Sequence, residues 1–185
     1  MQFRAVTKAL VILLATVCAT DVALSQQAVQ SSAILVSSPD GKYQAFWVDL
    51  TTTQHSAARR LIFVVDAASN ELLFTHCTFQ RRTGAAWNNS STACAIFDAP
   101  DNANIYLWML TKDSSSPAGG WSVRQIDVEK MAAQMMPDIF LEKTVRMGVE
   151  KVSWESDETL NAQFLLNGRS LTINLPAREH GNGPR

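Results

Sequence analysis

Between residues 33 and 176 the chain is dominated by short apolar or alternating segments that turn-forming residues separate. Runs rich in Val, Ile, Leu, Phe and Trp are typical of β-strands when Pro, Asp, Asn and Gly bound them. The first four predicted strands are 33–37, 43–50, 60–66 and 71–76. Because tight turns such as Pro39-Asp40-Gly41 join them, the pattern predicts a four-stranded antiparallel meander.

The same pattern returns twice. SSPDGKYQAFW, which begins at Ser37, aligns with WNNSSTACAIF from Trp87 and with WESDETLNAQF from Trp154. The alignment places Ala45, Ala95 and Ala162 at equivalent strand centres. Further predicted strands at 104–111, 121–127 and 170–175 follow, and Asn167-Gly168 is a strong hairpin signal. The third copy has no convincing outer strand.

The turn Ser38-Pro39-Asp40-Gly41 resembles the blade start of TolB-type and WD40-like β-propellers, and WNNSS and WESDE resemble a variant of it. This resemblance implies blade repeats of four strands. The chain holds about two and three-quarter such units, whereas closed propellers have at least four. We therefore expect an all-β fold, built as an incomplete β-propeller-like stack of antiparallel meanders. The alternative is a β-sandwich.

One segment departs from the β pattern. Residues 128–136 carry apolar side chains at helical spacing, with Asp127 available as N-cap and Pro137 as a stop. The sequence predicts a short helix there.

Residues 1–25 have the features of an export signal. Arg4 and Lys8 precede the apolar run 9–19, and Ala23-Leu24-Ser25 offers a small-x-small cleavage site. This run is shorter than the roughly 20 residues that a membrane-spanning helix needs. We expect cleavage before Gln26 and a periplasmic or secreted location.

Two alternatives to cleavage are a retained anchor and a lipoprotein modified at Cys18. After cleavage the expected organisation is a β-repeat domain over 26–176 and a disordered tail over 177–185. No later segment has the length of a membrane span.

The charge balance excludes one class of partner. The chain holds 16 Lys+Arg and 17 Asp+Glu, and it has no basic cluster larger than a pair such as Arg81-Arg82. Nucleic-acid binding needs several phosphate contacts, so we do not expect it.

In an oxidising compartment Cys77 and Cys94 predict a disulfide, with two buried free thiols as the alternative. His76 beside Cys77 lacks the spacing of a metal site, so no metal or cofactor is expected.

No catalytic motif accompanies the three histidines, His55, His76 and His180. Whether the protein is an enzyme is left uncertain, and the sequence favours a non-enzyme. The alternative is a small secreted hydrolase or glycan-active protein that uses paired carboxylates such as Asp49 and Asp101.

A stack of meanders has two ends. The turns around Asp40, Asn89 and Asp157 are predicted to share one end. The opposite end collects His55, Arg81, Arg82 and Asp101, which form the predicted binding site. We expect a non-enzymatic binding or scaffold protein of the cell envelope, with a protein partner or self-association through loops or sheet edges.

Overall fold

The computed structural model describes residues 34–50, 59–79, 81–113, 120–141 and 144–178. These residues form three antiparallel sheets, none of them closed, so the all-β expectation is confirmed. The first sheet comprises β1 (Ile34–Ser37), β2 (Tyr43–Leu50), β3 (Arg59–Asp66) and β4 (Leu72–Phe79). The second comprises β5 (Arg82–Trp87), β6 (Ala93–Ala99), β7 (Tyr106–Lys112) and β8 (Trp121–Ile126). The third comprises β9 (Met147–Trp154), β10 (Thr159–Leu166) and β11 (Arg169–Pro176).

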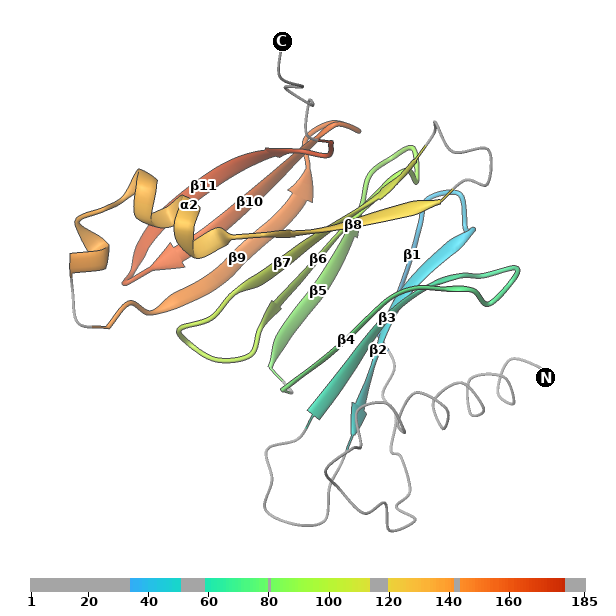
Figure 1. Ribbon diagram of the computed structural model, residues 1–185, viewed down its shortest axis with the longest axis horizontal. Coiled ribbons are helices and arrows are strands. Elements are labelled where there is room, and N and C mark those ends of the chain that lie inside the picture. The colour runs from blue at the N-terminus through green and yellow to red at the C-terminus, as the bar shows by residue number, and fades with distance from the viewer. Residues whose placement is uncertain (1–33, 51–58, 80, 114–119, 142–143, 179–185) are drawn as a thin grey trace.

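The three sheets stand side by side in chain order (Figure 1). Within each sheet the strands follow one another as a meander, and the third sheet has three strands instead of four. The first strands β1, β5 and β9 contact one another in turn. The arrangement is therefore a stack of three sheets, and it differs from the two packed layers of a β-sandwich.

Each sheet has two faces, and strand alternation decides which side chains lie on each. We call the face toward the preceding sheet in the chain the backward face, and the opposite one the forward face. In β2, Ala45 and Trp47 lie on the forward face, whereas Phe46 and Val48 lie on the backward face. In the third sheet, Leu160 and the other buried residues of β10 lie on the backward face.

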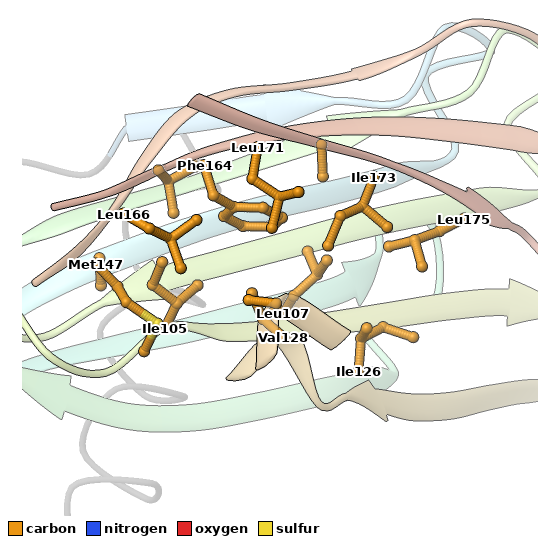
Figure 2. Close-up of a cluster of buried hydrophobic side chains, with 14 of the residues drawn as sticks. Ile105, Leu107, Ile126, Val128, Met147, Phe164, Leu166, Leu171, Ile173 and Leu175 are labelled. Carbon is orange, nitrogen blue, oxygen red and sulfur yellow. The ribbon is translucent and has the colours of Figure 1, made fainter. Parts of the chain in front are cut away.

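Two joints hold the stack together. The first joint, between the first and second sheets, packs Trp47, Ile62 and Phe74 against Ile96 and Trp108. The second joint, between the second and third sheets, is larger and is shown in Figure 2. Its labelled members are Ile105, Leu107, Ile126, Val128, Met147, Phe164, Leu166, Leu171, Ile173 and Leu175.

A tryptophan repeats the same contact at both joints. The indole Nε1 of Trp87 donates to the carbonyl oxygen of Val36 (3.1 Å), and that of Trp154 donates to Ala86 (2.8 Å). Val36 and Ala86 directly precede Ser37 and Trp87, which are equivalent positions of the aligned repeats. The repeat seen in the sequence is therefore also a repeat of sheet-to-sheet geometry.

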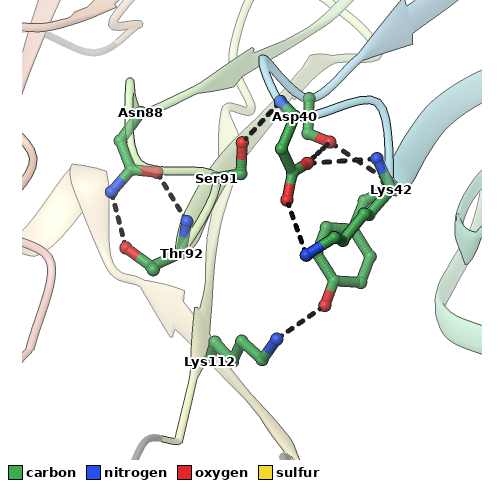
Figure 3. Close-up of polar contacts among 8 residues, drawn as sticks. Asp40, Lys42, Asn88, Ser91, Thr92 and Lys112 are labelled. Atoms are coloured by element: carbon green, nitrogen blue, oxygen red, sulfur yellow. Dashed lines mark hydrogen bonds and ion pairs between the residues drawn. The ribbon is translucent and has the colours of Figure 1, made fainter.

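The turns at one end of the stack also contact each other. The backbone N–H of Asp40 donates to Ser91 Oγ (3.0 Å), and that of Ser90 donates to Asp157 Oδ1 (2.9 Å). Figure 3 shows the first of these contacts, beside the bond from Lys112 Nζ to the hydroxyl of Tyr43 (2.9 Å). The predicted common end is confirmed, and we call it the turn end.

The alignment of the third repeat is off by one residue. Ser38 and Asn88 each donate to a carbonyl five positions later, but Glu155 donates to Thr159, four positions later. The third turn is one residue shorter. Asn161, rather than Ala162, is therefore equivalent to Ala45.

Helix α2 (Val128–Met135) follows the second sheet as predicted, and η1 (Ile139–Leu141) follows it. Asp127 caps the helix by accepting from the Lys130 N–H. Val128 and Ala132 are buried in the second joint. None of the helices among the described residues is long and apolar enough to cross a bilayer.

Strand β5 was not predicted, because RTGAAW carries little of the usual strand signal. Its small residues have a structural reason. A Cβ at Gly84 would lie 2.4 Å from the end of the Phe97 ring, so glycine leaves room for that ring. The hairpin at Asn167-Gly168 is confirmed, since both residues have positive φ.

Candidate functional site

The end of the stack opposite the turns, which we call the loop end, has a buried polar cluster in the first joint. Thr83 of β5 and Asp98 of β6 are paired across the strands. Asp98 is fully buried, and its carboxylate accepts from the hydroxyls of Thr83 (3.0 Å) and Thr78. Asp98 therefore lies on the face of β6 that otherwise carries apolar side chains. Both of its carboxylate oxygens accept hydrogen bonds, as a buried charge requires.

His76 of β4 faces the same carboxylate. Its Nε2 lies 3.9 Å from Asp98 Oδ2, and its ring lies 4.3 Å from the Trp108 ring, centroid to centroid. Burial lowers the pKa of His76 despite the attraction of Asp98. Burial raises the pKa of Asp98, although the two threonine hydrogen bonds, His76 and Arg60 oppose this shift.

A second polar pair completes the cluster. Asp49 of β2 and Arg60 of β3 are direct cross-strand partners. The guanidinium donates twice to the carboxylate, from Nε (2.6 Å) and from Nη2 (3.0 Å). Its Nη1 also donates to the backbone oxygen of Arg81 (2.9 Å). A bidentate pair of this kind is geometrically specific, so it holds the Arg60 guanidinium in place against the backbone oxygen of Arg81.

The structure brings three of the four predicted site residues to the loop end. Arg81 and Arg82 are exposed, and Arg81 Nη1 donates to Asn102 Oδ1 (3.3 Å) beside Asp101. Arg82 Nη2 donates to the Glu150 backbone oxygen of the third sheet (3.0 Å). The fourth residue, His55, lies outside the described residues.

Asp101 is engaged within its own loop. It accepts from the backbone N–H groups of Ala103 and Asn104, both at 2.7 Å. Burial opposes the shift, but these bonds and the charge of Arg81 hold the pKa of Asp101 below its usual value. With Asp49 bound to Arg60, both carboxylates named for a glycan-active site already have structural partners.

The contacts of His76 bear on acid–base chemistry. The described partners of His76 are Asp98 and the rings of Tyr106 and Trp108. The nearby hydroxyls, Thr78 and Thr83, donate to Asp98 instead of to the imidazole. Within the described ranges no group of three or more His, Cys, Asp or Glu is placed to hold a metal ion.

The sequence offered a weak signal for this cluster. His76 lies beside Cys77 in a stretch without metal-site spacing or a catalytic motif, and neither His76 nor Asp98 is among the predicted site residues. Cys94, Ile96 and Asp98 are two residues apart along β6, so strand alternation puts Asp98 on the same face as these two buried apolar side chains. The predicted strand 71–76 ends before Thr78, whereas β4 extends to Phe79.

The predicted disulfide is not formed, and the structure has both cysteines as free thiols. Cys77 packs with Val48 and Leu61 on the backward face of the first sheet. Cys94 lies in the first joint, on the forward side of that sheet. The first sheet therefore separates the two sulfur atoms, and the alternative of free thiols describes the structure.

The turn end has a cleft of ≈ 640 Å³ between the second and third sheets. Hydroxyls and charges of both signs line it, among them Thr92, Thr111, Glu158 and Arg178. Arg178 Nη2 donates to the Lys112 backbone oxygen (2.7 Å). Opposite charges at the rim give this cleft no single preference for an anion or a cation.

Known proteins show little similarity to this chain. No protein-family model matches the chain, and no curated protein matches its sequence. The solved apo structure of AtxE2 isopeptidase is similar at a TM-score of 0.41 and 17% identity. The match covers 73% of this chain and 21% of that chain, so this chain spans about a fifth of that structure. A similarity at this level assigns neither fold nor activity.

Proposed function

We propose that this protein is a non-enzymatic binding or scaffold module that works outside the cytoplasm and contacts a protein partner through its loop end. The export signal predicted over residues 1–25 supports the location. The open stack supports a scaffold role, because its outer sheets present faces and strand edges that a closed ring would not have.

One observation carries the choice of surface. Arg81 and Arg82 present two adjacent positive charges at the loop end, and a hydrogen bond from the first sheet holds the backbone at Arg81. The buried Asp49–Arg60 pair binds the backbone oxygen of Arg81, so the position of Arg81 does not depend on its own flexible side chain. Guanidinium groups that a fixed backbone segment carries suit carboxylates on a partner surface. The partner surface is therefore expected to be acidic.

We also propose that the three sheets are blade-like repeats of the TolB and WD40 type. The repeated indole-to-carbonyl contact of Trp87 and Trp154 supports this relation, as do the linked turns at one end. Propeller-like proteins commonly use an end face for binding, which agrees with the choice of the loop end.

The test replaces both arginines by glutamate and measures capture of the partner. Protein purified gently from its source should be recovered at a mass above that of one chain. Immobilised Arg81→Glu/Arg82→Glu chain should then lose the co-purifying protein. The matched control is Lys130→Glu/Lys151→Glu, which makes the same change of charge at two exposed positions on α2 and β9.

Two results would overturn the proposal. Equal capture by the arginine variant and the control would remove the loop end as the binding surface. Turnover of an ester, peptide or glycan that is lost in Asp49→Asn or Asp101→Asn would make the protein an enzyme of the carboxylate type.

A further inference from the structure

The backward face of the first sheet is apolar and buried, although no described element packs on it. Val48, Leu61 and Phe63 are each only 1% exposed. Phe46 stacks on Phe63 with ring centroids 5.1 Å apart, and Cys77 packs against the same cluster. All described members of this cluster come from β2, β3 and β4. The described residues therefore supply no partner for this apolar face.

The repeat shows that this is a docking face. The equivalent backward face of the second sheet packs on the first sheet through Cys94 and Ile96. That of the third sheet packs on the second through Leu160 and Phe164. The first sheet has the same apolar backward face but no preceding sheet in the described chain.

A second copy of the chain does not fit there as a preceding sheet. The forward face of the third sheet, which would have to dock, is polar: Asn161 donates to Asn174 (2.8 Å), and Gln163 donates to Asn161 (3.3 Å). The position of the joint tryptophan is taken by Ser37 in the first repeat. A junction between two copies would therefore lack both the apolar forward face and the indole donor that the two joints share.

The chain itself offers one apolar occupant. The undescribed residues are 1–33, 51–58, 80, 114–119, 142–143 and 179–185. Three of these segments adjoin the first sheet in the chain, but 51–58 (TTTQHSAA) has no large apolar side chain and residue 80 is a single glutamine. Residues 1–33 lead directly into β1, which pairs with β2, and they contain the run ALVILLATVCA at 9–19.

We propose that the apolar run 9–19 docks on the backward face of the first sheet in the uncleaved chain. Burial of apolar surface is the driving force, and the run takes the place that a preceding sheet would occupy. Cleavage before Gln26 would remove the run and leave this face uncovered in the exported chain. The proposal concerns the opposite side of the first sheet from the polar cluster and does not depend on the loop-end partner.

Two cysteines give a direct test. Cys77 is half-buried on the docking face, whereas Cys94 is buried in the first joint, where burial raises the pKa of its thiol. Chain 1–185, translated without membranes so that residues 1–25 stay attached, is compared with chain 26–185 during alkylation. Cys77 should react about tenfold more slowly in chain 1–185, since access controls thiol reactivity. Cys94 should stay protected in both chains, as the control for folding.

Equal reaction of Cys77 in the two chains, with Cys94 protected, would overturn the proposal. If Cys94 reacts in chain 26–185, that chain has unfolded, and full-length Leu13→Asp/Leu14→Asp replaces it as the uncovered form.

A cross-link then identifies the occupant. A short bismaleimide should join Cys18 to Cys77 within one chain of the full-length protein, and Cys18→Ser should abolish the product. Cross-linked peptides that occur only at the mass of two chains would show that a second copy covers the face. That result, or the absence of any Cys18–Cys77 product, would overturn the proposal.

Discussion

The two joints of the stack have the same geometry but different chemistry. In both, an indole N–H of the following sheet donates to a backbone oxygen of the preceding sheet. In both, the forward face of one sheet packs on the backward face of the next. The buried core of the second joint is apolar, whereas that of the first joint contains Asp98, His76 and the Asp49–Arg60 pair at the loop end. The same sheet-to-sheet packing thus contains an apolar core at one joint and a polar network at the other. The polar joint is the one that supports the proposed binding surface.

The largest effect is expected in the apolar joint. Phe164 is fully buried there, and Phe164→Ala should lower the free energy of unfolding by about 3–5 kcal/mol, because it leaves a cavity in close-packed surroundings. Phe74→Ala in the first joint is the matched control, and it should cost less because Phe74 is 8% exposed. Urea unfolding measures both variants. An equal or larger loss in Phe74→Ala would mean that the first joint carries as much of the core.

A smaller loss is expected when the polar joint is altered. Asp98→Leu should lower the free energy of unfolding by about 1–3 kcal/mol, because the buried hydroxyl of Thr78 and the half-buried hydroxyl of Thr83 lose their acceptor. The triple variant with Thr78→Val and Thr83→Val should recover part of this loss. A triple variant no more stable than Asp98→Leu would show that these hydrogen bonds are not the source of the effect.

Trp87→Phe and Trp154→Phe test whether the two joints are equivalent. Each substitution removes one indole-to-carbonyl hydrogen bond and should cost about 0.5–1.5 kcal/mol, plus a small packing loss. Thermal and urea unfolding of both variants give the comparison. Losses that differ severalfold would contradict the equivalence of the joints.

The smallest effect is a dependence on pH that only the polar joint should show. Since burial lowers the pKa of His76 below 6.5, the unfolded chain binds this proton more readily than the folded chain. The contribution of His76 to stability is therefore present above pH 6.5 and is lost as the pH falls through its lowered pKa. Wild type should lose stability relative to His76→Gln between pH 7.5 and pH 5.5 in urea unfolding. A constant difference would mean that His76 does not titrate differently on folding.

Much of the fold was predictable because it rests on local signals. Strands 43–50 and 60–66 and the helix after Asp127 were found at nearly their observed bounds, since alternation, turns and capping are encoded within a few residues. Strand β5 was missed because RTGAAW carries little strand signal; Gly84 makes room for the ring of Phe97, its partner on β6, and nothing within β5 itself records that contact. The one-residue shift of the third repeat was missed because two turns of different length look alike.

The candidate site was less predictable. Arg81, Arg82 and Asp101 were placed at the correct end, because a meander fixes which loops lie together. Asp98 and His76 were passed over, since their importance comes from the meeting of β4 with β6 across two sheets. The disulfide failed for a related reason: an even number of cysteines says nothing about which face of a sheet each one occupies.

The sequence by itself determined the all-β class, the meander order, the repeat and the short helix, because each depends on hydrophobic period and turn chemistry within a short window. The tertiary structure decided which side chains meet. It placed Cys77 and Cys94 on opposite sides of the first sheet, and it buried Asp98 against Thr78, Thr83 and His76. Contacts between sheets join residues that are far apart in the chain, and they depend on how the sheets stack, which no local pattern records.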